Sequence, residues 1–311
     1  MPGTMNSLDI HPLEESVIEA VWIQWRSTGA LIDSDRNART MVDPEALLLV
    51  SLTLRHHERR LWDVLASWAK NGSKLFSLQR VKNLLDRFPD LTKDRLAEFA
   101  LRASVEGNDF RWRSLAGADS GPPARNQDLW EAYPSVWHPS ALMLRMRLGI
   151  GIGVAPDLLS FLISLGGEWA SARLIAQATD YSVYSIRRVA DDMASAQLIE
   201  STQAKPVQYR AKIEAWRKLL GIGIELPEWR FWHQVYSFVA KVIIANESGE
   251  WEGLSPYLLS TKLRDLVEDH QDAFILNHIN LPDPRKYIGE EYLAAFAETI
   301  LSLAAWIRNE V

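Results

Sequence analysis

The stretch that decides the fold runs from residue 156 to residue 216: PDLLSFLISLGGEWASARLIAQATDYSVYSIRRVADDMASAQLIESTQAKPVQYRAKIEAW. Its apolar residues recur at helical spacing in three segments, at about 156–165, 171–178 and 182–196. Residues 179–181 are too few for anything but a tight turn, and Ser182 is placed to cap the third helix. Two short strands follow, with a tip at 202–206. The stretch therefore predicts two helices, a turn, a third helix and a two-stranded hairpin.

Residues 171–200, SARLIAQATDYSVYSIRRVADDMASAQLIE, resemble the winged helix-turn-helix of bacterial transcription regulators of the MarR and ArsR kind. The whole resemblance covers about sixty residues, roughly a fifth of the chain. Asp180 takes the turn position where Gly is commoner, and Asp tolerates a left-handed backbone better than most residues. The resemblance implies a mainly α, multi-helical protein that contains a winged helix-turn-helix with a small two-stranded β wing. It also implies binding to double-stranded DNA.

In that family the third helix enters the major groove by its first two turns. We expect Val183, Ile186, Val189 and Met193 to lie in the core. The residues left to face DNA on this helix are Ser182, Tyr184, Ser185, Arg187 and Arg188. The wing and the residues just after it add Lys205, Arg210 and Lys212 as candidate phosphate contacts. Alternatively, Arg187 and Arg188 only solvate a helix face, where Asp191 and Asp192 partly cancel their charge.

The composition is that of an ordinary globular protein, with 47% hydrophobic and 24% charged residues and a net charge of −6. The charge is unevenly spread, because both ends are acidic and the positive excess lies between residues 55 and 150. With no cysteine in the chain, disulfides and thiol catalysis are excluded. No long apolar run and no secretory signal are visible, so we expect a cytoplasmic protein that does not enter the membrane.

The pattern of helices and loops predicts an N-terminal helical domain at 1–104, a linker at 105–140, the winged helix-turn-helix at 141–220 and a C-terminal helical domain at 221–311. Asp43, Ser77 and Ser255 mark helix starts in the flanking domains. The run ALMLRMRLGIGIGV at 141–154 alternates like a strand, but we favour a helix that ends near Gly149. The basic segment 77–88 is an ordinary solvated helix, a second helix-turn-helix-like element or a basic helix packed beside the winged domain, flanking the DNA.

The last helix carries an apolar stripe that has two interpretations. The stripe consists of Leu293, Phe296, Ile300, Leu303 and Ile307. Terminal helices of this kind often form the dimer interface of winged-helix regulators, and symmetric dimers match palindromic operators. A homodimer through this helix and packing of the helix onto the N-terminal domain account for the stripe equally well.

Catalytic and cofactor motifs are weak in this sequence. Gly149, Gly151 and Gly153 lack the βαβ unit of a nucleotide-binding loop. The adjacent His56 and His57 would point apart on a helix, unlike the i, i+4 pair of a metal site. We therefore expect no cofactor, no metal site and no enzymatic activity.

Two functions from different classes remain open. In the first, the protein is a sequence-specific DNA-binding transcriptional regulator. In the second, the winged helix is a protein-interaction module, and the protein binds and neutralises a partner, as winged-helix antitoxins of the abortive-infection type do.

Overall fold

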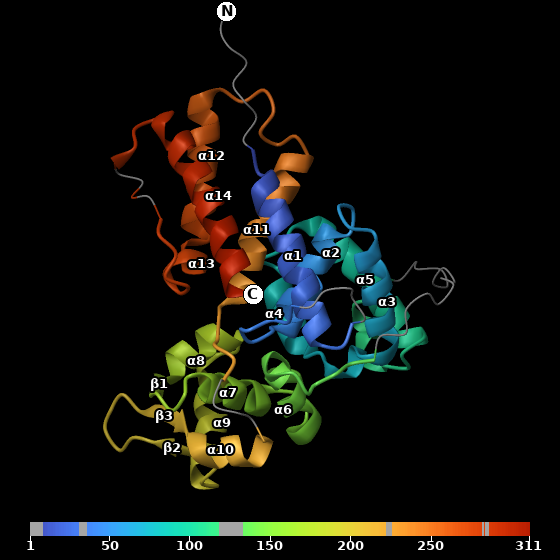
Figure 1. Cartoon of the computed structure of the whole chain (residues 1–311), viewed down its shortest axis with the longest axis vertical. Helices are drawn as coiled ribbons and strands as arrows, with labels where there is room; N and C mark the ends of the chain where they lie inside the picture. Colours follow the sequence, from blue (N-terminus) through green and yellow to red (C-terminus); the bar gives the residue numbers. More distant parts are fainter. Residues whose placement is uncertain (1–8, 31–35, 118–132, 222–225, 282, 284–285) are drawn as a thin grey trace, which may run out of the picture.

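The computed structural model describes residues 9–30, 36–117, 133–221, 226–281, 283 and 286–311, which form two lobes (Figure 1). The large lobe contains α1 (His11–Ser27), α2 (Pro44–Leu54), α3 (Arg60–Asn71), α4 (Leu78–Leu85), α5 (Asp90–Val105), α11 (Trp232–Glu247), α12 (Pro256–Asp269), α13 (Gln271–Ile275) and α14 (Glu291–Glu310). The small lobe contains α6 (Leu142–Ile150), α7 (Val154–Ser164), β1 (Ala170–Ser171), α8 (Ala172–Thr179), α9 (Val183–Ser195), β2 (Ile199–Ser201), β3 (Gln208–Ala211) and α10 (Ile213–Leu220). Short 3-10 helices in the described ranges include η1 (Ser73–Leu75), η2 (Phe110–Ser114) and η3 (Pro139–Ala141). The protein is therefore mainly α, as predicted.

The predicted helix starts are confirmed by their capping hydrogen bonds. The side chains of Asp43, Ser77, Ser182 and Ser255 each accept a hydrogen bond from the backbone N–H three residues later. One start differs, because α7 begins at Val154, two residues before the predicted Pro156. Gly153 precedes it with φ at +143°, a backbone conformation that glycine adopts without steric cost. The alternating run before it forms the helix α6, as favoured from sequence.

The first and last helices of the chain share one hydrophobic core. α14 packs against α1, and α11 packs against α2, in the upper part of Figure 1. Four residues of the α14 stripe, Phe296, Ile300, Leu303 and Ile307, are completely buried in this core. The stripe is therefore covered within the chain, which is the packing alternative of the two that the sequence left open. The segments predicted as separate N-terminal and C-terminal domains contribute to the same core.

The predicted linker is only partly within the described ranges, because residues 118–132 lie outside them. Its first part packs tightly on the large lobe. Trp112 of η2 is completely buried and contacts Phe76 and Phe99 edge to face, with ring centroids 6.0 and 5.1 Å apart. Buried aromatic pairs of this geometry add to the hydrophobic gain of burial. Residues 105–117 therefore belong to the large lobe and not to a free connector.

The small lobe has its own core and a three-stranded antiparallel sheet in the order β1-β3-β2. In the hairpin, Ile199 lies opposite Ala211 and Ser201 lies opposite Tyr209, which confirms the predicted strand pair. The third strand, β1, was not predicted from sequence. It has only two residues, and its existence depends on pairing with β3 from a distant part of the chain. So short a segment carries no periodicity of its own.

Candidate nucleic-acid interface

The turn between α8 and α9 has the left-handed residue that the sequence predicted. Asp180 ends α8 with φ 56° and ψ 37°. Tyr181, which follows it, is buried, and Ser182 then caps α9. Residues 179–181 thus form a short connection between two helices with one left-handed residue. The turn sets the direction of α9 relative to α8.

α9 presents two distinct faces. Ile186, Ala190 and Met193 are buried in the small-lobe core. Val183 and Val189, predicted to lie in the core, are half-buried at its edge. On the opposite face Tyr184, Arg187 and Arg188 are exposed, and the exposed fraction of Tyr184 is 77%. A bare tyrosine ring beside two arginines is a surface suited to contacting base edges and phosphates.

The two arginines of α9 are free of hydrogen bonds and ion pairs to the described residues. Ser182 and Ser185, in contrast, are bonded to each other, since Ser182 Oγ donates to Ser185 Oγ at 2.9 Å and accepts from its N–H at 3.1 Å. Among the predicted site residues of α9, the two arginines and Tyr184 are therefore those with free functional groups.

The wing residues lie in different situations. Lys205 is exposed at the tip of the hairpin. Arg210 donates from Nε to Glu200 Oε2 at 2.6 Å, and its guanidinium lies over the ring of Trp169 at 4.4 Å. Lys212 is half-buried at the start of α10. A phosphate would have to compete with Glu200 for Arg210, so Lys205 is the better placed cation of the wing.

The acidic residues of α9 follow the arginines by one turn. Asp191 accepts a hydrogen bond from Tyr209 Oη at 2.7 Å, and burial together with this carboxylate raises the pKa of Tyr209 to about 12. Asp191 therefore holds α9 on the sheet. The positive charge of the exposed face is concentrated in the first half of α9.

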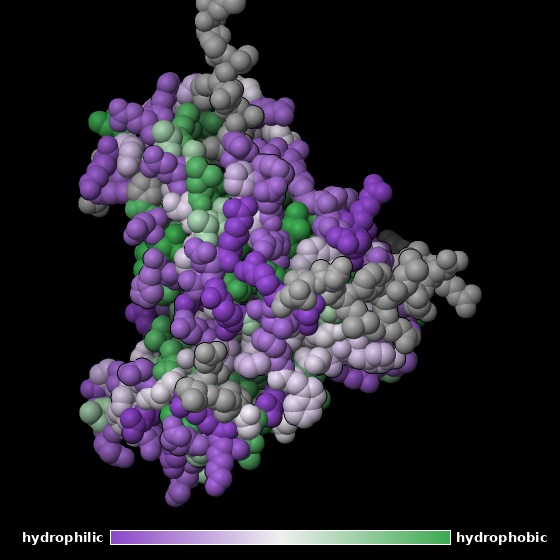
Figure 2. Space-filling view, in the orientation of Figure 1, coloured by the Kyte–Doolittle hydropathy of each residue, from purple (hydrophilic) through white to green (hydrophobic). Residues whose placement is uncertain are grey.

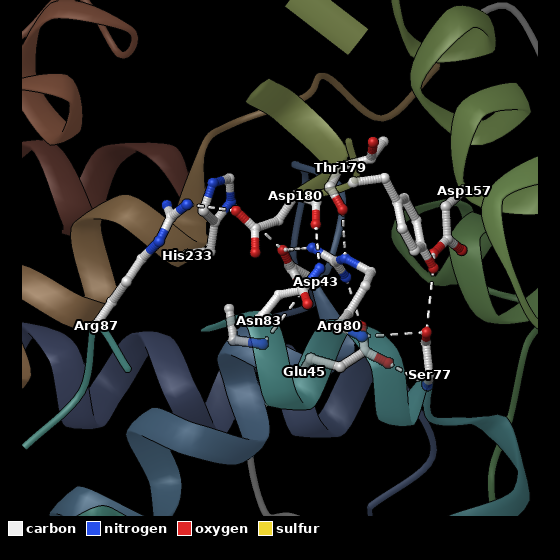
Figure 3. A network of polar contacts seen from close by, with 12 residues as sticks. Asp43, Glu45, Ser77, Arg80, Asn83, Arg87, Asp157, Thr179, Asp180 and His233 are labelled. Atoms are coloured by element: carbon white, nitrogen blue, oxygen red, sulfur yellow. Dashed lines mark hydrogen bonds and ion pairs between the residues drawn. The ribbon is translucent and has the colours of Figure 1, made fainter. Parts of the chain in front are cut away.

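A second group of charged residues is completely buried where the two lobes meet (Figure 3). It forms an alternating chain in which Arg80 lies between Asp43 and Glu45, and Arg147 lies between Glu45 and Asp157. We call these five residues the buried charge chain. Its side chains come from α2, its N-cap, α4, α6 and α7, so it joins helices of both lobes. No side chain in it is more than 3% exposed.

Each arginine of the buried charge chain makes a bidentate contact with a carboxylate. Arg80 is bidentate to Asp43, at 2.9 and 2.7 Å, and donates from Nε to the carbonyl of Thr179 at 2.7 Å. Arg147 is bidentate to Asp157, at 2.7 and 2.9 Å. Burial opposes their charge, but the carboxylates outweigh it and raise the pKa of both guanidinium groups. Burial would raise the pKa of Asp43, but Arg80 keeps it below its ordinary value, with smaller contributions from His233 and the N–H of Ala46.

The buried charge chain was not predicted from the sequence. Asp43 was interpreted only as a helix start, and Arg80 belonged to the basic segment 77–88, for which a solvated face was one of the alternatives. A solvated position is wrong for Arg80, because the residue is completely buried. No local pattern marks the difference, since an arginine on the polar face of an amphipathic helix has the same spacing whether water or another lobe covers it.

Other candidate chemistry is limited in the described ranges. They hold no group of three His, Asp or Glu residues placed to bind a metal ion. Within the same ranges, none of the helices is both long and apolar enough to cross a membrane. His57, singled out from sequence, contacts the carboxylate of Glu247.

Comparison of the chain with protein-family models, with curated proteins and with solved structures found no match. A function for this protein must therefore be argued from its own geometry.

Proposed function

We propose that this protein is a sequence-specific DNA-binding transcriptional regulator whose small lobe is a winged helix-turn-helix. In this proposal α9 is the recognition helix and the β2–β3 hairpin is the wing. The order α7, β1, α8, turn, α9, β2 and β3 supports it, because this is the order of elements in a winged helix. The three-stranded sheet packs beside the three helices, as the lower part of Figure 1 shows.

The observation that carries the proposal is the exposed face of α9. Arg187 and Arg188 are exposed and make no hydrogen bond or ion pair with the described residues, and they lie next to the exposed Tyr184. Arginine pairs bidentately with guanine edges in the major groove, and tyrosine contacts phosphates and bases. Ser182 and Ser185 add hydroxyls at the N-terminal end, and Lys205, Arg210 and Lys212 are the proposed phosphate contacts on the wing side.

The surface around α9 is consistent with a polar partner. The face of the small lobe that is seen in Figure 2 is mostly hydrophilic, with small hydrophobic areas between the polar ones. Because the overall charge is −6, affinity for phosphates must come from a local cluster of cations and not from the protein as a whole. We therefore expect binding that falls steeply as salt rises.

The test is fluorescence anisotropy of the purified protein on a labelled duplex from the region upstream of its own gene. A scrambled duplex of the same length is titrated in parallel at several salt concentrations. We expect tighter binding to the genomic duplex. The double variant Arg187→Ala/Arg188→Ala should lose this preference while the protein keeps its fold.

A matched control removes two positive charges elsewhere. Arg59 and Lys262 lie in the large lobe, on α3's N-terminal side and on α12, and both are exposed. Arg59→Ala/Lys262→Ala should bind the genomic duplex like the wild type. Equal weakening by both double variants would show that only net charge matters and would contradict the groove assignment. Absence of binding to any duplex at low salt would reject the proposal.

One observation favours the second function, a protein-interaction module that neutralises a partner as an antitoxin does. Leu148 and Ile150 at the end of α6 are 60% and 48% exposed, and Leu219 on the neighbouring α10 is 72% exposed. Arg145 donates to the carbonyl of Leu220 at 2.5 Å, which holds α6 and α10 together. Exposed apolar residues on two neighbouring helices favour protein contacts. Under this alternative, Arg187→Ala/Arg188→Ala should leave partner binding intact.

A homodimer on a palindromic operator remains part of the first proposal. The α14 stripe is buried inside the chain, so the dimer would need another surface. Sedimentation velocity of the free protein and of its DNA complex tests this point. A cytoplasmic location and the absence of enzymatic activity also remain predictions.

A further inference from the structure

We propose that α4 positions the recognition helix, by holding the turn between α8 and α9 with one polar face. This inference rests on the proposed DNA-binding function and assigns a role to a helix that was interpreted from sequence as solvated or as flanking DNA. Its polar residues are directed at the turn and at the buried charge chain (Figure 3).

The contacts follow one side of α4. Ser77 caps α4, Arg80 and Asn83 lie on it, and Arg87 follows just after its end, so these four residues recur every three or four positions along one side. Val81 and Leu84, on the neighbouring side of α4, are buried in the large-lobe core. α4 is therefore held firmly on the large lobe while its polar face meets the small lobe.

Each residue of the turn meets a residue of this face. Arg80 Nε donates to the carbonyl of Thr179 at 2.7 Å, and Asn83 Nδ2 donates to the carbonyl of Asp180 at 2.7 Å. These are the backbone carbonyls that the end of α8 leaves without intrahelical partners. The polar face of α4 thus supplies the donors that end α8 at this point.

Asp180 is also held through its side chain. Its carboxylate pairs with the guanidinium of Arg87, and the carboxylate is only 9% exposed, against 36% for Arg87. Burial raises the pKa of Asp180 above the ordinary value, and Arg87 acts in the opposite direction. A glycine at this position would satisfy the left-handed backbone equally well or better, so the backbone alone does not account for aspartate here.

Tyr181 fixes the turn from its other side. Ser77 Oγ lies 3.1 Å from Tyr181 Oη, which donates to Asp157 Oδ2 of α7 at 2.9 Å. The N-terminal end of α9 is therefore tied to α4, to α7 and, through Arg80 and Asp157, to the buried charge chain. A recognition helix held in one orientation does not lose that orientational freedom again when it binds DNA.

The experiment compares free protein and DNA complex in the same variants. Asp180→Gly and Arg87→Gln each remove the ion pair to α4, and Asp180→Asn keeps an oxygen acceptor and tolerates the left-handed backbone. Lys82→Gln is the matched control, because Lys82 is an exposed cation of α4 directed away from the turn contacts. Amide hydrogen exchange of residues 179–188 is measured without DNA, and affinity is measured on the labelled upstream duplex.

We expect faster exchange of these amides in Asp180→Gly and Arg87→Gln, and affinity weaker by about tenfold, the usual effect of losing a hydrogen bond to a charged group. Asp180→Asn should lose less, and Lys82→Gln should match the wild type in both measurements. The salt dependence should stay that of the wild type in all four variants, because none of them removes a phosphate contact.

Several results would overturn the inference. Unchanged exchange in Asp180→Gly and Arg87→Gln would show that α4 does not hold the turn. Faster exchange with unchanged affinity would show that the contact does not serve DNA binding. A loss of affinity in Lys82→Gln, with a reduced salt dependence, would make α4 a direct DNA contact instead. If the wild type binds no duplex, the proposed function fails and the positioning role for DNA falls with it, while the exchange data still decide whether α4 holds the turn.

Discussion

Two pairs of arginines in this protein have opposite surroundings. Arg80 and Arg147 are completely buried between the lobes, and their donors are bonded to carboxylates and backbone carbonyls. Arg187 and Arg188 are exposed on α9 and make no ion pair or hydrogen bond with the described residues. The same side chain is thus used once to join two lobes and once, in our proposal, to contact DNA.

The difference shows that the role of a charged side chain depends on the ion pairs and hydrogen bonds that it already makes within the protein. A buried guanidinium loses its hydration and must recover that cost from well-placed carboxylates, so it is not available to an outside ligand. An exposed guanidinium keeps its hydration and can exchange water for a phosphate or a guanine edge. The predictions below test this contrast.

The largest expected effect is on stability. Arg80→Met leaves Asp43 and Glu45 short of their partner, and we expect the free energy of unfolding to fall by about 3–5 kcal/mol. Arg80→Lys keeps the charge without the planar fork and should lose less. Urea denaturation followed by circular dichroism measures both variants. Arg187→Met is the control, and it should stay within about 0.5 kcal/mol of the wild type. Similar losses from the buried and the exposed variants would remove the contrast.

The next effect is on DNA affinity. Arg187→Ala and Arg188→Ala, made singly, should each cost about 1–3 kcal/mol if the side chain reads a base edge, and the cost should apply to the genomic duplex only. A phosphate contact would instead weaken binding to every duplex and lower the salt slope by about one. Anisotropy at several salt concentrations distinguishes the two contacts. Neither change should alter the urea midpoint, because both side chains are exposed.

A smaller effect concerns pH and His233, a buried histidine beside the buried charge chain. Burial lowers the pKa of His233 to about 3, and Asp43 Oδ2, 3.7 Å from Nδ1, only partly offsets this. An unfolded histidine titrates near about 6.5. Between these values the unfolded chain carries the extra proton, so the free energy of unfolding should fall as pH drops below about 6.5, by at most about 1.4 kcal/mol per pH unit.

Above about pH 6.5 His233 is neutral in both states and contributes no pH dependence. Urea midpoints measured between pH 5 and 7 check this, a window chosen to lie above the titration of most carboxylates. Burial also lowers the pKa of His138 and His270, so the wild type sums several contributions. The slope should therefore be shallower in His233→Gln than in the wild type, and unchanged in His278→Asn, a substitution at an exposed position. Equal slopes in all three proteins would contradict the assignment.

The smallest expected effect concerns Ser182, which caps α9 and, in our proposal, lies beside the DNA. Its hydroxyl caps α9, and Ser182→Ala should reduce stability by about 1 kcal/mol. Ser182→Asp restores a cap of similar strength but adds a negative charge where the proposal places DNA. We therefore expect Ser182→Asp to keep the stability of the wild type and to bind the genomic duplex more weakly. Normal binding by the aspartate variant would move the DNA away from the N-terminal end of α9.

Local features of the fold could be predicted from sequence because they depend on neighbours in the chain. Asp43 and Ser182 cap their helices by reaching a backbone N–H three residues away. The left-handed turn at Asp180 depends on the intrinsic tolerance of that residue. The exposed face of α9 follows from the helical spacing of Ile186 and Met193 on the opposite side. These features required no knowledge of the rest of the molecule.

What covers each element was decided only by the tertiary structure. The two-residue strand β1 exists because β3 lies beside it, and the α14 stripe is buried because α1 packs on it. Arg80 and Lys82 are both basic residues of α4, yet one is completely buried against Asp43 and Glu45 and the other faces solvent. Periodicity gives the direction of a side chain relative to its own helix. Whether water, a carboxylate or a second lobe lies in that direction depends on contacts between residues distant in sequence, and these arise only when the chain packs.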